Sequence, residues 1–226
     1  MDGELTRQAE SLFGAAVARP LPGPAADAPR EPVPQPEGAA GAPPLRLNLS
    51  ARQLRRLWQH VESIENFWQT LSEIEAGAVA RLAAAASERR WEIIFLTKRP
   101  QSAGYTAQVQ SQRWLASKGF SMPSVYVVQG SRGRIAAALD LDIVVDDRAE
   151  NCLDVVMDSK ARAILVWRDD ETLLPGAARR LGIGVVKSVG ECLDVLTRVD
   201  RAETDRQGMV TRLMRLLGRK EPAPVS

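Results

Sequence analysis

The chain has 226 residues, with 30 Lys and Arg against 28 Asp and Glu, so its formal charge is only +2. This length is enough for one domain with a core, and the balanced charge without a basic stripe gives no support to DNA binding. No apolar run approaches the ~18 residues of a membrane-spanning helix, and the N-terminus has no apolar signal core. Two cysteines, Cys152 and Cys192, lie in apolar patterns and are expected to be reduced. We therefore expect a cytoplasmic protein without a transmembrane segment.

The composition divides the chain into three parts. Residues 1–44 combine a short helical pattern with a segment rich in Pro, Ala and Gly. That segment has too little apolar surface to offset its ordering entropy, so we expect a flexible arm. Residues 45–202 are expected to form one domain. Residues 203–226 form a basic amphipathic tail, which we expect to pack on the domain; a helix lying on a membrane surface is the alternative.

Helical patterns dominate the chain before residue 90. Apolar residues recur at helical spacing within residues 1–19. The segment LRLNL at 45–49 alternates and predicts a short strand, and Ser50 then has the spacing of a capping box ahead of a helix over 50–64. A further helical pattern covers residues 66–90 and is interrupted near Gly77.

After residue 90, predicted strands alternate with predicted helices. Strands are expected at 92–96, 124–128, 142–145, 163–167 and 184–186, and helices at 103–118, 133–140, 149–158, 175–181 and 189–201. The first strand is apolar enough to be buried on both faces. This alternation predicts an α/β fold, a three-layer Rossmann-like domain with a mainly parallel sheet covered on both faces.

Polar clusters follow two of these strands, and ligands in open α/β sheets gather at the carboxyl ends of strands. Thr97, Lys98 and Arg99 follow the first strand, and Asp146 and Asp147 follow the third. The hydroxyl and backbone N–H of a threonine can bind phosphate, with charge from the neighbouring cations, and paired carboxylates suit Mg²⁺. The alternatives are an ordinary strand exit with exposed cations, and acids that cap the following helix.

A third candidate is Arg132, which stands between Ser131 and Gly133 after the strand at 124–128. A cation at this position can neutralise a phosphate or orient a carboxylate. Taken by itself, a solvated loop arginine is the simpler interpretation. The single histidine, His60, is expected in a surface or cap role.

In their order and spacing these segments resemble the haloacid dehalogenase-like (HAD) superfamily of phosphatases, and within it the nucleotidase branch related to 5'(3')-deoxyribonucleotidases. The resemblance covers about residues 66–200. The segment FLTKRP at 95–100 is similar to the second motif of that group, Ser131-Arg132-Gly133 stands in place of the third-motif lysine, and VVDD at 144–147 is similar to the fourth motif. The resemblance implies phosphate binding by Thr97, Lys98 and Arg132, and magnesium binding by Asp146 and Asp147.

The resemblance fails at the first motif, where the superfamily has an aspartate nucleophile and a second aspartate two residues later. Only Asp2 and Asp27 precede Thr97, and the candidate strand offers Asn48 and Ser50 at that spacing. An asparagine cannot form the aspartyl-phosphate, and a serine cannot act as a carboxylic acid. We therefore expect a pseudoenzyme with impaired catalysis that binds a phosphorylated small molecule, such as a nucleotide, together with Mg²⁺.

Two alternatives stay open on the sequence. The first is an active magnesium-dependent phosphatase or 5'-nucleotidase that takes its nucleophile from another chain, from Asp27, or from unusual chemistry at Asp146 and Asp147. The second is a non-catalytic interaction module, in which the N-terminal arm or the C-terminal tail binds a protein partner.

Overall fold

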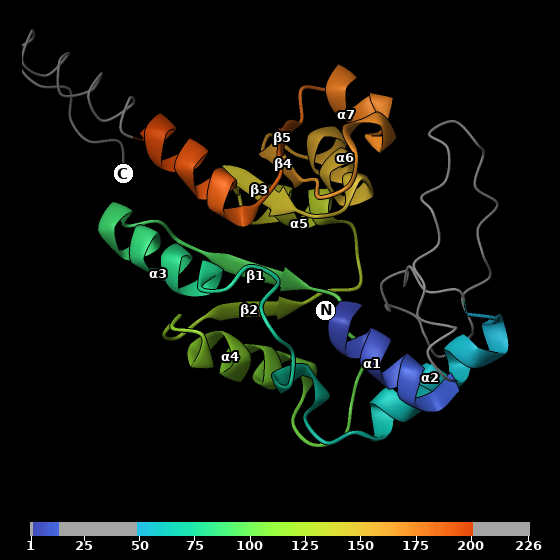
Figure 1. Cartoon of the computed structure of the whole chain (residues 1–226). Helices are drawn as coiled ribbons and strands as arrows, with labels where there is room; N and C mark the ends of the chain where they lie inside the picture. Colours follow the sequence, from blue (N-terminus) through green and yellow to red (C-terminus); the bar gives the residue numbers. More distant parts are fainter. Residues whose placement is uncertain (1, 14–48, 201–226) are drawn as a thin grey trace, which may run out of the picture.

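The computed structural model describes residues 2–13 and 49–200 of the chain, and every structural statement below refers to these residues (Figure 1). They form an α/β fold in which all paired strands are parallel. The predicted fold class is thus confirmed. No helix in this part of the chain is long and apolar enough to cross a membrane.

Two helices pack together near the start of the described chain. Helix α1 (Asp2–Phe13) lies against α2 (Ala51–Ser63) and buries Leu5 and Ala9 completely. Helix α2 begins with the predicted capping box, in which the Gln53 N–H donates to Ser50 Oγ and the Ser50 N–H donates to the Gln53 side chain. Of the predicted strand at 45–49, residues 45–48 lie outside the described residues, and Leu49 packs against the apolar core without joining a strand.

The next elements build a two-stranded sheet. They are the short 3₁₀ helix η2 (Phe67–Gln69), α3 (Ala78–Arg89), β1 (Ile94–Thr97), α4 (Ala107–Ser117) and β2 (Ser124–Val127). Ile94 lies opposite Ser124, and Thr97 lies opposite Val127. Helix α4 packs on β2 and on η2.

The remaining elements build a three-stranded sheet with the order β3-β4-β5. They are α5 (Arg132–Ala138), β3 (Ile143–Asp146), α6 (Ala149–Asp158), β4 (Arg162–Val166), the 3₁₀ helix η3 (Glu171–Leu173), α7 (Gly176–Arg180) and β5 (Gly184–Val186). A last helix occupies residues 189–200. The strands and helices predicted for this part are all present, with ends that differ by at most two residues.

The sheet is divided where the sequence predicted one continuous sheet. Among the described strands, β1 pairs only with β2, and β3 pairs only with β4. The prediction that the first strand is buried on both faces is wrong, because all four residues of β1 are only half-buried. A strand with one neighbour lacks the cover that a central strand receives from both sides.

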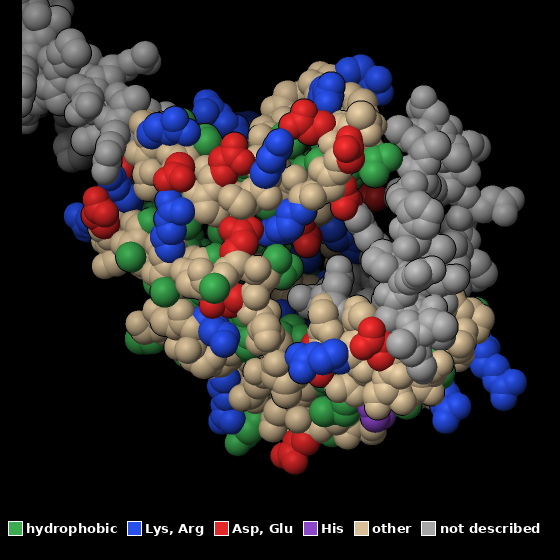
Figure 2. Space-filling model, in the orientation of Figure 1, with side chains coloured by type: hydrophobic (Ala, Val, Ile, Leu, Met, Phe, Trp, Pro, Cys, Tyr) green, Lys and Arg blue, Asp and Glu red, His purple; other side chains and the backbone are tan. Residues whose placement is uncertain are grey.

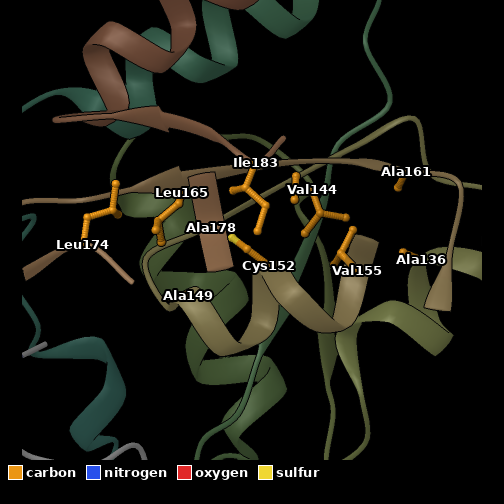
Figure 3. Close-up of a cluster of buried hydrophobic side chains, with 11 residues drawn as sticks. Ala136, Val144, Ala149, Cys152, Val155, Ala161, Leu165, Leu174, Ala178 and Ile183 are labelled. Atoms are coloured by element: carbon orange, nitrogen blue, oxygen red, sulfur yellow. The ribbon is translucent and has the colours of Figure 1, made fainter. Parts of the chain in front are cut away.

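The two largest apolar cores differ in composition. The core among α1, α2, η2 and α4 contains large side chains, including fully buried Phe67 and Trp68, whose rings meet edge to face with centroids 5.0 Å apart. The core between α6 and the β3–β5 sheet consists of small and aliphatic side chains, among them Cys152, Val155 and Leu165 (Figure 3). Both cysteines are free and buried, as predicted.

The described chain has two parts: the elements from α1 to β2, and the elements from α5 to the last helix. Ion pairs connect these two parts of the molecule. Arg81 and Arg89 on α3 pair with Asp194 and Asp200 on the last helix, at N–O distances of 2.5 and 3.3 Å. Glu75, which precedes α3, pairs with Arg168 after β4 at 2.6 Å. Helix α3 and the last helix lie on the same side of the molecule in Figure 1, and Figure 2 shows cations and acids interspersed over the visible face.

Candidate anion and metal site at the end of β3

The start of α5 places Arg132 in the interior of the protein. Ser131 caps the helix, with its Oγ 3.2 Å from the Gly133 nitrogen, and α5 packs closely on α6. The contact requires glycine at 133, because a Cβ there would lie 2.0 Å from the Asp154 carbonyl oxygen. Arg132 is consequently only 8% exposed, so the interpretation as a solvated loop arginine is wrong.

Asp146, the last residue of β3, lies beside this buried arginine. Its Oδ2 is 3.9 Å from Arg132 Nε. The Arg148 N–H donates to Oδ1 at 2.9 Å, and the Asn151 amide lies 3.0 Å from both carboxylate oxygens. Burial raises the pKa of Asp146 above its ordinary value, although the hydrogen bonds from Asn151 and Arg148 oppose this shift. The structure thus places Arg132 and Asp146, two of the predicted site residues, side by side.

The guanidinium of Arg132 has unused binding capacity. Burial lowers the pKa of Arg132, and the nearby Asp146 charge opposes that shift. Its Nη1 is enclosed and has no hydrogen-bond partner among the described residues. A buried donor without an acceptor loses its hydrogen bonds to water and forms no others, which costs free energy of folding. An acceptor beside Nη1 would remove this cost, which makes Arg132 a candidate anion-binding group.

The metal-binding capacity of the same site is limited. A carboxylate offers about four lone pairs, and three donor contacts from Arg148 and Asn151 already reach Asp146, two of them at Oδ1. Asp146 can therefore give one oxygen to a cation, and Asp147 is exposed and can give another. Within residues 2–13 and 49–200, no three His, Cys, Asp or Glu side chains gather as a metal site. Mg²⁺ is often held by one or two carboxylates together with water and ligand phosphates, and these two acids fit that pattern.

The predicted phosphate loop is not joined to this site. Thr97 ends β1, and its carbonyl accepts the Val128 N–H at 2.8 Å, while Lys98 is exposed. In the part of the chain that the structure describes, no hydrogen bond or ion pair links either residue to Arg132 or Asp146. The physical reason is the divided sheet, since β1 and β3 have no strand-to-strand hydrogen bonds that would align their carboxyl ends.

Arg99 lies in a different environment from the one that the sequence predicts. The sequence predicts that Arg99 adds charge to the Thr97 loop. Instead its Nη1 donates to Ser111 Oγ on α4 at 2.8 Å, and its guanidinium lies over the Trp68 ring, 5.2 Å from the centroid. Nothing local in the sequence distinguishes Arg99 from the exposed Lys98, because the partners that hold it come from distant segments.

Of the two candidates for a degenerate first motif, the structure describes only Ser50. Ser50 is an exposed helix cap, and both its hydroxyl and its backbone N–H are engaged with Gln53. Asn48 lies outside the described residues. His60 contacts Gln8 of α1 at 3.0 Å and therefore takes part in helix packing.

Comparison with known proteins assigns no family. No family model, no curated protein and no solved structure matches this chain. The similarity to the HAD superfamily therefore remains a prediction from the residues quoted above.

Proposed function

We propose that the chain binds a phosphorylated small molecule together with Mg²⁺ at the Arg132–Asp146 site, and that it hydrolyses the phosphate ester weakly or not at all. The observation that carries the proposal is the buried guanidinium of Arg132 beside the Asp146 carboxylate, with an Nη1 that no group in residues 2–13 or 49–200 accepts from. Phosphate is a suitable partner because a guanidinium can bind its oxygens in bidentate fashion. A nucleotide is the form that the resemblance to the nucleotidase branch favours.

Magnesium would link the acids to the ligand. One oxygen of Asp146 and the exposed carboxylate of Asp147 would hold the ion, and the ion would neutralise phosphate charge that Arg132 alone does not balance. Without the ion, a phosphate dianion would face two carboxylates at short range. Binding is therefore expected to depend on Mg²⁺.

The proposal of weak or absent hydrolysis rests on the acids that the chain contains. No aspartate occurs between Asp27 and Asp140, so residues 49–139 contain no candidate for the aspartate nucleophile of the similar phosphatases. Loss of a nucleophile removes most catalysis while binding interactions can persist. A binding or sensing role follows from this combination.

Isothermal titration of the full chain with nucleoside monophosphates, with and without MgCl₂, tests the proposal. Arg132→Met should weaken binding by about tenfold or more, because a hydrogen bond to a charged group is lost. The matched control is Arg134→Met, since Arg134 is exposed on the same helix and should leave binding unchanged. Asp147→Asn, at an exposed position, should reduce the dependence on Mg²⁺ without affecting folding.

Two results would overturn the proposal. Absence of binding by the wild-type chain to every monophosphate in the presence of Mg²⁺ removes the ligand class. Rapid turnover of p-nitrophenyl phosphate that disappears in Asp146→Ala shows an active phosphatase and removes the non-catalytic part. Circular dichroism of each variant separates loss of binding from loss of folding.

A further inference from the structure

A second candidate site lies in a cleft of about 200 Å³ between the two parts of the molecule. Its walls come from the segment 71–79, from α4, and from the residues that follow β1, β4 and β5. The apolar lining includes Leu71, Val79 and Trp114, and Ile74 stands in it with 65% of its surface exposed. An isoleucine this exposed would gain buried area if an apolar ligand covered it.

All charged side chains that line the cleft, except one, form ion pairs or accept backbone hydrogen bonds within the described residues. Glu73 accepts the N–H groups of Gly77 and Val79 at 3.1 and 3.0 Å. Glu75 accepts from Arg168 and from the N–H groups of Val189 and Gly190. Although burial acts to raise the pKa of Glu75, these hydrogen bonds outweigh it and lower the pKa. Glu75 is thus an ionised acid that neutralises Arg168.

Arg99 is the exception. Its only hydrogen bond among the described residues goes to the neutral Ser111 hydroxyl, and its Nε is enclosed without a partner. The described part of the chain provides no carboxylate within ion-pair distance of it. Burial alone lowers the pKa of Arg99 to about 10, so the group still carries its charge at neutral pH. The Trp68 ring offsets part of the cost of burying this charge, and an anion would offset more.

We propose that this cleft binds small hydrocarbon monocarboxylates, with the carboxylate on the Arg99 guanidinium and the hydrocarbon body against Leu71, Ile74 and Trp114. A carboxylate matches the guanidinium fork in bidentate fashion. A monoanion balances the one available positive charge, whereas a phosphate dianion would be repelled by the acids Glu73 and Glu75 in the same lining. The volume is below that of pockets for drug-sized ligands, ~300 Å³ and above, so the body has only a few carbon atoms.

The indole N–H groups give a direct readout of this site. Trp114 Nε1 donates to the Leu71 carbonyl in the cleft wall, and Trp68 Nε1 donates to the Pro100 carbonyl next to Arg99. In ¹H–¹⁵N spectra of the full chain, titration with 4-methylpentanoate should shift both indole signals in a saturable manner. The signals of Trp58 and Trp91, which do not line the cleft, should stay in place.

Variants and ligand analogues decide whether Arg99 carries the binding. Arg99→Met should weaken 4-methylpentanoate binding by about tenfold or more, through loss of a charged hydrogen bond. Arg113→Met is the matched control, because Arg113 also lies over an aromatic ring, that of Tyr105, but does not line the cleft. The neutral amide 4-methylpentanamide should bind the wild-type chain at least about tenfold more weakly than the acid, and this comparison needs no variant to fold.

The proposal has clear contrary outcomes. Absence of saturable shifts, or equal affinity for the acid and the amide, overturns it. Tighter binding of 3-methylbutyl phosphate than of 4-methylpentanoate overturns the preference for a monoanion. Arg132→Met should leave carboxylate binding unchanged, so this proposal and the one for the Arg132–Asp146 site succeed or fail separately.

Discussion

The cores of the two parts of the molecule are packed with side chains of different size. Among α1, α2, η2 and α4 the core is built from large side chains, with fully buried Phe67, Trp68 and the polar Gln110 of α4. Around β3–β5 it is built from alanines and small aliphatic residues, which allow α5 and α6 to touch through their backbones at Gly133. The first part should therefore be most sensitive to removed atoms, and the second to added atoms.

Removal of a ring from the first core should have the largest effect. Phe67→Ala deletes a fully buried ring that meets Trp68 edge to face. We expect the free energy of unfolding to fall by about 3–5 kcal/mol. Urea denaturation of this variant measures the change, with Met157→Ala as a control at a side chain that is 71% exposed. Similar losses in the two variants would contradict the assignment of Phe67 to the core.

Addition of one methyl group to the second core should have the next largest effect. Gly133→Ala places a Cβ 2.0 Å from the Asp154 carbonyl oxygen, so α5 must move away from α6. We expect a loss of about 1–3 kcal/mol from overpacking. Gly130→Ala is a control in the same loop, because no atom of the described residues lies within 4 Å of its added Cβ. If both variants melt at the same temperature, the close contact between α5 and α6 is wrong.

A smaller effect is expected where a helix begins in the first part. Ser50→Ala removes the hydroxyl of the capping box of α2, which should cost about 1 kcal/mol. Ser63→Ala is the matched control at the other end of the same helix, since its exposed hydroxyl donates only to the His60 carbonyl. Thermal melts should show a lower midpoint for the first variant and almost no change for the second.

The smallest expected effect concerns Asp146, where a helix begins in the second part. Its raised pKa means that the folded state holds the proton more tightly than the unfolded state. The carboxyl therefore imposes no penalty below pH 3.8, its ordinary pKa, and destabilises the fold increasingly as pH rises through the shifted value. The effect is small because the hydrogen bonds from Asn151 and Arg148 oppose burial.

Denaturation at a series of pH values tests this sign. Relative to Asp146→Asn, the wild-type chain should lose stability as pH rises above 3.8. Asp142→Asn, at an exposed position three residues before Val145, should run parallel to the wild type. A wild-type chain that gains stability over Asp146→Asn with rising pH would show that the hydrogen bonds and Arg132 outweigh burial.

The sequence predicts the local elements of this molecule and part of its candidate site. Periodicity predicts all five strands of the described residues and most of their helices, and the spacing of Ser50 and Gln53 predicts the start of α2, because these features depend on neighbours in the chain. Arg132 follows β2 and Asp146 ends β3 of the other sheet, and the two residues meet because α5 packs on α6, the helix that follows β3. The clearest failure is Arg99, which has the same local pattern as Lys98 but is held by Trp68 and Ser111.

Local sequence patterns also do not predict that the sheet is divided in two. Alternating strands and helices predict parallel pairing, but they do not specify which strand edges find a partner. Thr97 consequently ends one sheet and Asp146 the other, and the predicted phosphate loop is separated from the predicted metal acids among the described residues. The residues of β1 are half-buried for the same reason, because β1 has only one neighbouring strand among those described.

The ion pairs between α3 and the last helix make the joint between the two parts sensitive to the solvent. Arg81 and Asp194 are 49% and 59% exposed, so dissolved ions reach and screen them, while the apolar cores are unaffected. Raising ionic strength should therefore loosen the junction before it weakens either core. The cleft at Arg99 spans this junction, and its width should vary with the salt content of the medium.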